Sequence, residues 1–168
     1  AEVYNLTVDE AHTYFVGDGA WLVHNACDPK RDRTREEFQR QSAQIREELG
    51  IKPTGSNVGI ADYEIDGQTG TLRAVSRNTN DPTFVQLRNE SERRFHTFPG
   101  GGGQGEFDTE AKILEELSSM FDVNSSGRIV LYTDRPPCAS CWGVIEQFRQ
   151  RHPNIMVDVI EGDLRLNQ

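Results

Sequence analysis

Two short stretches of the chain, DTE at residues 108–110 and PPCASC at residues 136–141, predict its fold and its chemistry. The first stretch holds two carboxylates and the second holds two thiols, and both kinds of group bind Zn²⁺. A zinc ion that activates water takes three protein ligands and keeps one coordination position open. A further carboxylate beside the ion can move protons. We therefore predict three metal ligands and one proton shuttle, namely Asp108, Cys138 and Cys141, and Glu110.

Hydrophobic spacing places these stretches at the starts of two helices, with a buried strand between them. The expected helices are 34–49, 108–121 and 139–151, and the expected strands are 57–65, 71–75, 128–133 and 154–160. The first two strands are expected to form a hairpin closed by a loop at 66–70. Strands that alternate with helices after an initial hairpin predict an α/β fold, in which a mixed central sheet is flanked by helices.

The segment at residues 76–106 is polar and ends in a glycine-rich tract. Glycine has high conformational freedom and adds little to a core, so we expect a surface loop here. Long loops in compact domains are often functional. His96 lies just before the tract and is a second possibility for the third zinc ligand in place of Asp108.

The composition limits the classes of function. The 168 residues suffice for one domain and a short appendage. The formal net charge of −9 argues against nonspecific coating of duplex nucleic acid, which depends on many Lys and Arg residues. No apolar run is long enough to cross a bilayer, so no membrane anchor is expected. One C-x-x-C among three cysteines suits a metal or redox site, and Cys27 is expected to be an unpaired thiol.

The first 26 residues predict a β-hairpin appendage, with strands at 3–8 and 13–16 and a turn at 17–19 that leads into 21–23. The sequence VYNLTVDEAHTYFVGDGAWLVHNAC resembles the end of the Hint (intein-like) pretoxin domain, which precedes the toxin module of bacterial polymorphic toxins. The resemblance implies that His24 and Asn25 stand where asparagine cyclisation supports cleavage. Only the end of that domain is present, so we expect no self-cleavage.

The D-T-E and P-C-A-S-C motifs make the rest of the chain resemble the cytidine deaminase-like superfamily, and more narrowly the deaminase modules that follow pretoxin Hint domains. The resemblance implies a three-layer fold, a Zn²⁺ cofactor, the ligands and proton shuttle already named, and a backbone amide of Thr109 that binds the pyrimidine carbonyl. An aspartate ligand is a departure, because His or Cys is usual there. The expected domains are a Hint remnant at 1–26, a linker at 27–33 and a deaminase toxin at 34–168.

The resemblance further implies a hydrolytic enzyme that converts cytosine to uracil in nucleic acid, with single-stranded DNA favoured over RNA. The reaction needs an exposed base, and single strands bind to aromatic and basic side chains. The expected contacts are Phe95, His96, Phe98 and Trp142 for bases, and Arg88, Arg93, Arg94 and Arg135 for phosphates. Each has an alternative: the phenylalanines can pin the loop, Trp142 can lie in the core, and Arg93 and Arg94 can pair with Glu90 and Glu92.

Other functions stay open at this point. The enzyme could act on RNA or free nucleosides, the zinc could stabilise an interaction module without catalysis, or the cysteine pair could carry out thiol–disulfide chemistry. Glu110 separates catalysis from a structural zinc site, because a structural site has no use for a carboxylate beside the metal. The resemblance also implies a cognate immunity protein, and a secreted effector that acts in the cytoplasm of a target bacterium.

Overall fold

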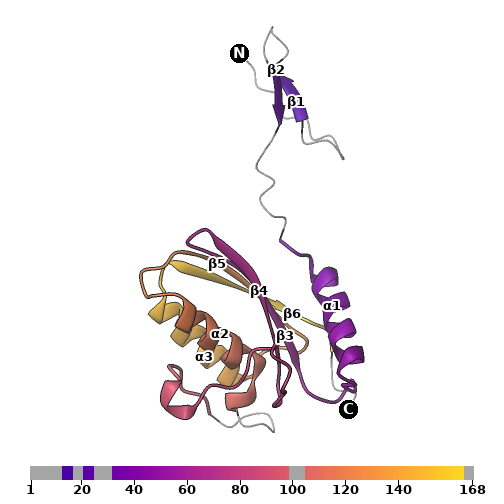
Figure 1. The fold of residues 1–168 in the computed structure, drawn as a ribbon, viewed down its shortest axis with the longest axis vertical. Coiled ribbons are helices and arrows are strands. Elements are labelled where there is room, and N and C mark those ends of the chain that lie inside the picture. Colours follow the sequence, from indigo (N-terminus) through magenta and orange to yellow (C-terminus); the bar gives the residue numbers. More distant parts are fainter. Residues whose placement is uncertain (1–12, 17–20, 25–31, 99–104, 165–168) are drawn as a thin grey trace. The chain divides into compact units, whose positions relative to one another are not determined.

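The computed structural model describes residues 13–16, 21–24, 32–98 and 105–164. The chain divides into two compact units, residues 1–32 and residues 33–168. In the first unit, β1 (Thr13–Val16) pairs with β2 (Trp21–His24) in an antiparallel hairpin (Figure 1). The expected hairpin is therefore present. The expected strand at 3–8, the turn at 17–19, Asn25 and Cys27 lie outside the described residues.

The second unit is built on a four-stranded sheet in the order β4-β3-β5-β6 (Figure 1). Its strands are β3 (Val58–Ile65), β4 (Gln68–Val75), β5 (Gly127–Thr133) and β6 (Ile155–Glu161). β3 is antiparallel to both of its neighbours, whereas β5 and β6 are parallel, so the sheet is mixed. A parallel pair needs a crossover connection, and helix α3 (Ala139–Arg151) provides it.

Helices cover both faces of this sheet. Helix α1 (Arg35–Glu48) lies on one face, and α2 (Thr109–Met120) packs beside α3 on the other (Figure 1). Two short 3-10 helices, η1 (Glu90–Glu92) and η2 (Gly105–Phe107), lie between β4 and α2. The expected α/β fold, with a mixed sheet between two helical layers, is confirmed. No described helix is both long and apolar enough to cross a membrane.

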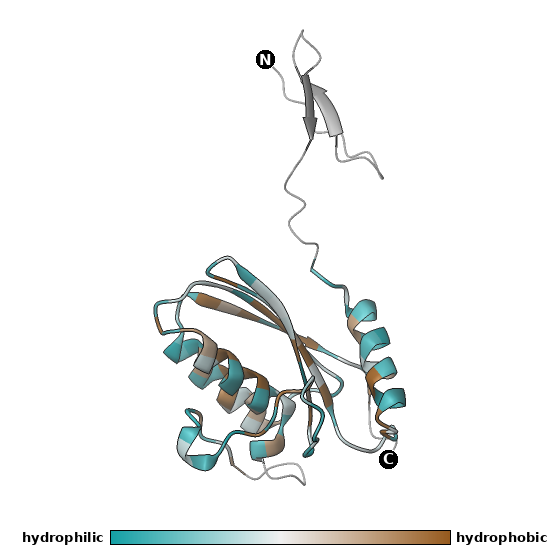
Figure 2. Cartoon of the chain, in the orientation of Figure 1, coloured by the Kyte–Doolittle hydropathy of each residue, from teal (hydrophilic) through white to brown (hydrophobic). Residues whose placement is uncertain are grey.

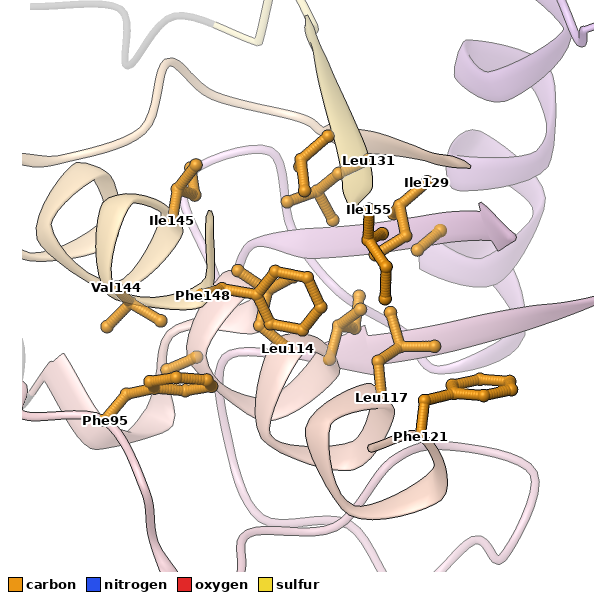
Figure 3. Packing of buried hydrophobic residues seen from close by; sticks show 14 of the residues in the cluster. Phe95, Leu114, Leu117, Phe121, Ile129, Leu131, Val144, Ile145, Phe148 and Ile155 are labelled. Atoms are coloured by element: carbon orange, nitrogen blue, oxygen red, sulfur yellow. The ribbon is translucent and has the colours of Figure 1, made fainter. Parts of the chain in front are cut away.

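The larger core lies between the sheet and helices α2 and α3 (Figure 3). Helix α2 contributes Leu114 and Leu117, which lie three residues apart on one face and are fully buried. Phe95 joins this core from the segment before α2, and its ring centroid lies 5.9 Å from that of Phe148. The expectation that Phe95 stacks on a base is therefore wrong. Its ring anchors the segment to the core, as the alternative allowed.

The smaller core lies between the sheet and α1. Phe38 is fully buried, and its ring stacks on that of Tyr132 with 5.4 Å between the centroids. Thr34 and Glu37 form the predicted capping box at the start of α1. The helices carry both hydrophilic and apolar residues, as expected of helices with one buried face (Figure 2).

The prediction of a loop over residues 66–70 is wrong. The hairpin closes with only two residues, Asp66 and Gly67, and β4 already begins at Gln68. Both turn residues have positive φ angles, 50° and 76°, which matches the right-handed twist of the strands. Gly70 belongs to the strand, where it is paired with Tyr63 of β3, and a Cβ there would lie 2.5 Å from the hydroxyl oxygen of Tyr63. Its glycine serves the packing of the tyrosine ring, so it does not mark a turn.

Candidate functional site

The structure brings the three predicted metal ligands together at the N-termini of α2 and α3. Cys138 and Cys141 lie at the start of α3, and their thiols donate to Asp108 Oδ2 over 3.5 Å and 3.4 Å. The two Sγ atoms are 2.8 Å apart. Asp108 is the N-cap residue of α2, yet its side chain makes no capping hydrogen bond. Its carboxylate is therefore directed to the thiols and does not serve the helix end.

Acidic groups crowd this place. Burial raises the pKa of Asp108, and the two thiol hydrogen bonds oppose that rise. Burial also raises the pKa of the Cys141 thiol, and the nearby Glu110 carboxylate raises it further. A divalent cation would relieve the repulsion between the ionised forms of these groups. Two thiols and a carboxylate form a donor set that Zn²⁺ accepts, so the residues present fit a zinc site.

His96 is not part of this cluster. Among the described residues, the only group of three or more His, Cys, Asp and Glu side chains placed to hold a metal consists of Asp108, Cys138 and Cys141, whose ligand atoms all lie within 4.8 Å of one another. His96 is exposed, and its backbone is bonded to α3. The geometry therefore favours Asp108 over His96 as the third ligand.

Glu110 lies in the first turn of α2 and is 2 % exposed. Its carboxylate accepts a hydrogen bond from Thr109 Oγ1 at 2.9 Å. Burial raises the pKa of Glu110, the Asp108 carboxylate adds to the rise, and hydrogen bonds from the Thr109 and Thr133 hydroxyls oppose it. A carboxyl group with a raised pKa is suited to take up and release a proton during a reaction. Glu110 is thus available for proton transfer beside the ligand cluster.

Asn57 is a site residue that no motif in the sequence predicts. It lies just before β3, and its Nδ2 donates to Thr133 Oγ1 at 2.7 Å and to Thr109 Oγ1 at 3.3 Å. Both hydroxyls also form hydrogen bonds with the Glu110 carboxylate. Its Oδ1 is buried and has no hydrogen-bond partner among the described residues. A buried acceptor without a partner is costly and rare, so Asn57 Oδ1 is a candidate hydrogen-bond acceptor in the site.

Helix α2 approaches the sheet closely at the same point. A Cβ on Gly59 of β3 would lie 2.6 Å from Thr109 Cβ and 2.7 Å from Thr109 Oγ1. Real Cβ atoms almost never come so close to another heavy atom, so only glycine fits here. This close approach brings Thr109 and Glu110 against the sheet, beside Asn57.

Arg135 was expected to bind phosphate, and the structure gives it backbone partners. Its Nη2 donates to the carbonyl oxygens of Pro53 at 3.1 Å and Gly55 at 2.6 Å. Arg46 holds the same loop through the carbonyl oxygens of Pro53 and Ser56, and forms a buried ion pair with Asp134 at 2.7 Å. Because this loop leads directly into Asn57, the two guanidinium groups support the position of that residue.

Among the other expected substrate contacts, the aromatic rings are exposed, whereas two of the arginines form ion pairs within the protein. Phe98 and Trp142 are 49 % and 42 % exposed, so both rings are accessible, and Trp142 is not a core residue. Arg88 pairs with Glu116 at 2.7 Å and Arg93 pairs with Glu106 at 2.5 Å, so Arg93 does not use the partners suggested by the sequence. Arg94 is exposed, and its backbone N–H donates to Glu115.

In zinc deaminases a first ligand stands two residues before a glutamate and two thiols supply the other ligands, and this site has the same arrangement with Asp108 where those enzymes have His or Cys. A family profile described as the BURPS668_1122 family of deaminases, Toxin-deaminase, matches residues 36–163. The chain belongs to this toxin-deaminase family, and it is therefore a hydrolytic deaminase of toxin type. Comparisons with curated proteins and with solved structures give no match.

Proposed function

We propose that this protein is a zinc-dependent deaminase that converts cytosine to uracil in single-stranded DNA. The observation that carries the proposal is the buried Glu110 carboxylate beside the Asp108, Cys138 and Cys141 cluster. A zinc site that only stabilises the fold has no use for such a carboxylate. Burying an unneeded carboxylate costs several kcal/mol or a shifted pKa, which argues against an incidental placement.

Asp108, Cys138 and Cys141 would hold the zinc ion. When bound, the ion supplies Lewis acidity that lowers the pKa of water. Glu110 takes a proton from the water that attacks C4 of cytosine and delivers a proton to the amino group that leaves as ammonia. The hydroxyls of Thr109 and Thr133 hold the Glu110 carboxylate in place for both transfers.

The burial of Glu110 supports a substrate whose target base is unstacked. A paired base inside a duplex cannot reach a carboxylate that is 2 % exposed. The backbone amide of Thr109 and the unpartnered Asn57 Oδ1 are the polar groups proposed to bind the cytosine nucleotide. The exposed rings of Phe98 and Trp142 are proposed to stack on bases of the strand, with His96 beside them. Such stacking is possible with a single strand and supports that substrate class.

The toxin family supports the wider biological proposal. We infer a secreted effector whose deaminase acts in the cytoplasm of a target bacterium, where uracil in DNA causes mutations. A cell that makes such an enzyme needs a cognate immunity protein. The hairpin of β1 and β2 is proposed to be the remnant of a pretoxin Hint domain, followed by a linker and the deaminase from residue 34.

The test is incubation of the zinc-loaded protein with matched single-stranded DNA, duplex DNA, RNA and free deoxycytidine, followed by detection of uracil. We expect conversion that is fastest in single-stranded DNA and is lost when a chelator removes the metal. Faster conversion of RNA or of the free nucleoside would reassign the substrate. No conversion of any of the four would contradict the proposal and favour a zinc-stabilised interaction module.

A further inference from the structure

The segment that ends in the exposed ring of Phe98 is fixed to helix α3 by side chains that the proposed chemistry does not use. Gln147 Oε1 accepts from the His96 N–H at 2.9 Å, and Gln147 Nε2 donates to the His96 carbonyl oxygen at 3.0 Å. Ser140 Oγ accepts from the Phe98 N–H at 3.1 Å. Bonds from alternate residues are the pattern of an extended segment that lies along a partner. Residues 96–98 therefore lie along α3 as a strand would.

The amide of Gln147 can satisfy these bonds in one orientation only. Its Nε2 also donates to the Gly143 carbonyl oxygen at 3.0 Å, so two carbonyl oxygens face the NH2 group and one N–H faces the oxygen. A reversed amide would place its NH2 against an N–H and its oxygen against two carbonyl oxygens. Gln147 thus forms a fixed link between the middle of α3 and the backbone of His96.

Gly105 leaves room for this arrangement, and Gly143 shows where the Phe98 ring lies. A Cβ on Gly105 would lie 2.7 Å from Ser140 Oγ and 2.8 Å from the Phe98 carbonyl oxygen, so a side chain there would push the segment away. A Cβ on Gly143 would lie 3.5 Å from Phe98 Cε1, which is an ordinary contact. The Phe98 ring therefore lies over the first half of α3, which also carries Cys141 and the exposed Trp142.

We propose that Gln147 is a positioning residue that, with Ser140, holds Phe98 as a stacking platform for a base next to the target cytosine. This inference rests on the proposed function, because it assigns Phe98 to a strand whose cytosine reaches Glu110. A ring that is half exposed gains stacking strength when its backbone is already fixed, because less conformational freedom is lost on binding. Gln147 bonds to the His96 backbone and to the Gly143 carbonyl oxygen, and Ser140 bonds to the Phe98 N–H, so Gln147 acts on Phe98 only by fixing the segment that carries it.

The test compares Gln147→Ala with Gln150→Ala, an exposed glutamine on the same helix whose Nε2 donates to Glu146 Oε1 at 3.2 Å. Three quantities are measured: KM and kcat for a single-stranded oligonucleotide with one cytosine, the Kd for that oligonucleotide in a Glu110→Gln background, and hydrogen exchange of the His96 and Phe98 amides. Gln147→Ala should raise KM and Kd about fivefold, the lower end of what one stacked base contributes, with kcat within about twofold. Exchange at both amides should accelerate, and Gln150→Ala should match the wild type.

The outcomes separate this inference from the proposed function. Wild-type protein that binds the oligonucleotide but forms no uracil contradicts the proposed function, and a raised Kd in Gln147→Ala then still supports the positioning role. A Kd and KM equal to those of Gln150→Ala overturn the inference while deamination stands. A loss of kcat together with a lower Tm also overturns it, because that result indicates a general structural role. Wild-type protein that binds no single strand overturns both.

Discussion

Gly59→Ala tests how closely helix α2 packs on the sheet at the site. The new Cβ would lie 2.6 Å from Thr109 Cβ, whereas carbon atoms pack at about 3.5–4.0 Å, so Thr109 has to move by about 1 Å. Overpacking of this kind costs about 1–3 kcal/mol, and alanine returns about 0.5–1 kcal/mol relative to glycine in a strand. The two ranges leave a net loss of about 0–2.5 kcal/mol in the free energy of unfolding, and their midpoints leave about 1 kcal/mol. Because Thr109 donates to Glu110, deamination should fall as well.

The assay is thermal unfolding together with deamination of single-stranded DNA. A loss of 1 kcal/mol lowers Tm by about 2–4 °C in a chain of this size. Gly143→Ala is the matched control, because its Cβ meets Phe98 Cε1 at 3.5 Å and alanine is favoured in a helix, so its Tm should rise slightly. Wild-type Tm and wild-type activity in Gly59→Ala would contradict the close packing of Thr109 against Gly59.

Two further changes test the metal site and a buried histidine. Asp108→Ala should sharply lower the zinc content measured by metal analysis, whereas Asp158→Ala, at a half-exposed aspartate of β6, should not. Full zinc content and full activity in Asp108→Ala would contradict the ligand assignment. Burial lowers the pKa of His152, whose ring is bonded to Ser118 and to the Asp122 carbonyl oxygen, so the unfolded chain binds a proton that the folded protein does not. Protonation of the unfolded chain therefore lowers the free energy of unfolding as the pH falls below about 6.5, by at most about 1.4 kcal/mol per pH unit, and has no effect well above that pH. Urea unfolding should therefore show that wild type loses stability relative to His152→Gln from about pH 7 to about pH 5, and parallel curves would contradict this reading.

The ligand cluster could be predicted because local signals place its members. Asp108 and the two cysteines each stand at a helix start, and a buried strand separates the two helices. The strands that precede the two helices, β4 and β5, lie on either side of β3 and run in the same direction, so both end at the same edge of the sheet and the two half-sites meet there. The capping box at Thr34 and Glu37 and the layer order were accessible for the same reason, since both depend on spacing within short segments.

The remaining features depend on contacts between distant segments. Asn57 lies 52 residues from Thr109 and 76 residues from Thr133, and asparagine before a strand is common, so nothing local indicates its role. Gly70 suggested a turn, but its function is set by the ring of Tyr63 on the neighbouring strand. Arg135 suggested phosphate binding, but its partners are backbone carbonyl oxygens in a loop 80 and 82 residues away.

The central claim is that Glu110 transfers the protons of a zinc-dependent deamination, and Glu110→Gln tests it most directly. Glutamine keeps the size and the hydrogen bond to Thr109 but cannot take up a proton, so cytosine conversion in single-stranded DNA should fall by about 10²–10⁴-fold while zinc content stays at the wild-type level. Glu116→Gln on the same helix removes an ion pair with Arg88 and should keep the activity of the wild type. Unchanged conversion of cytosine by Glu110→Gln would contradict the claim.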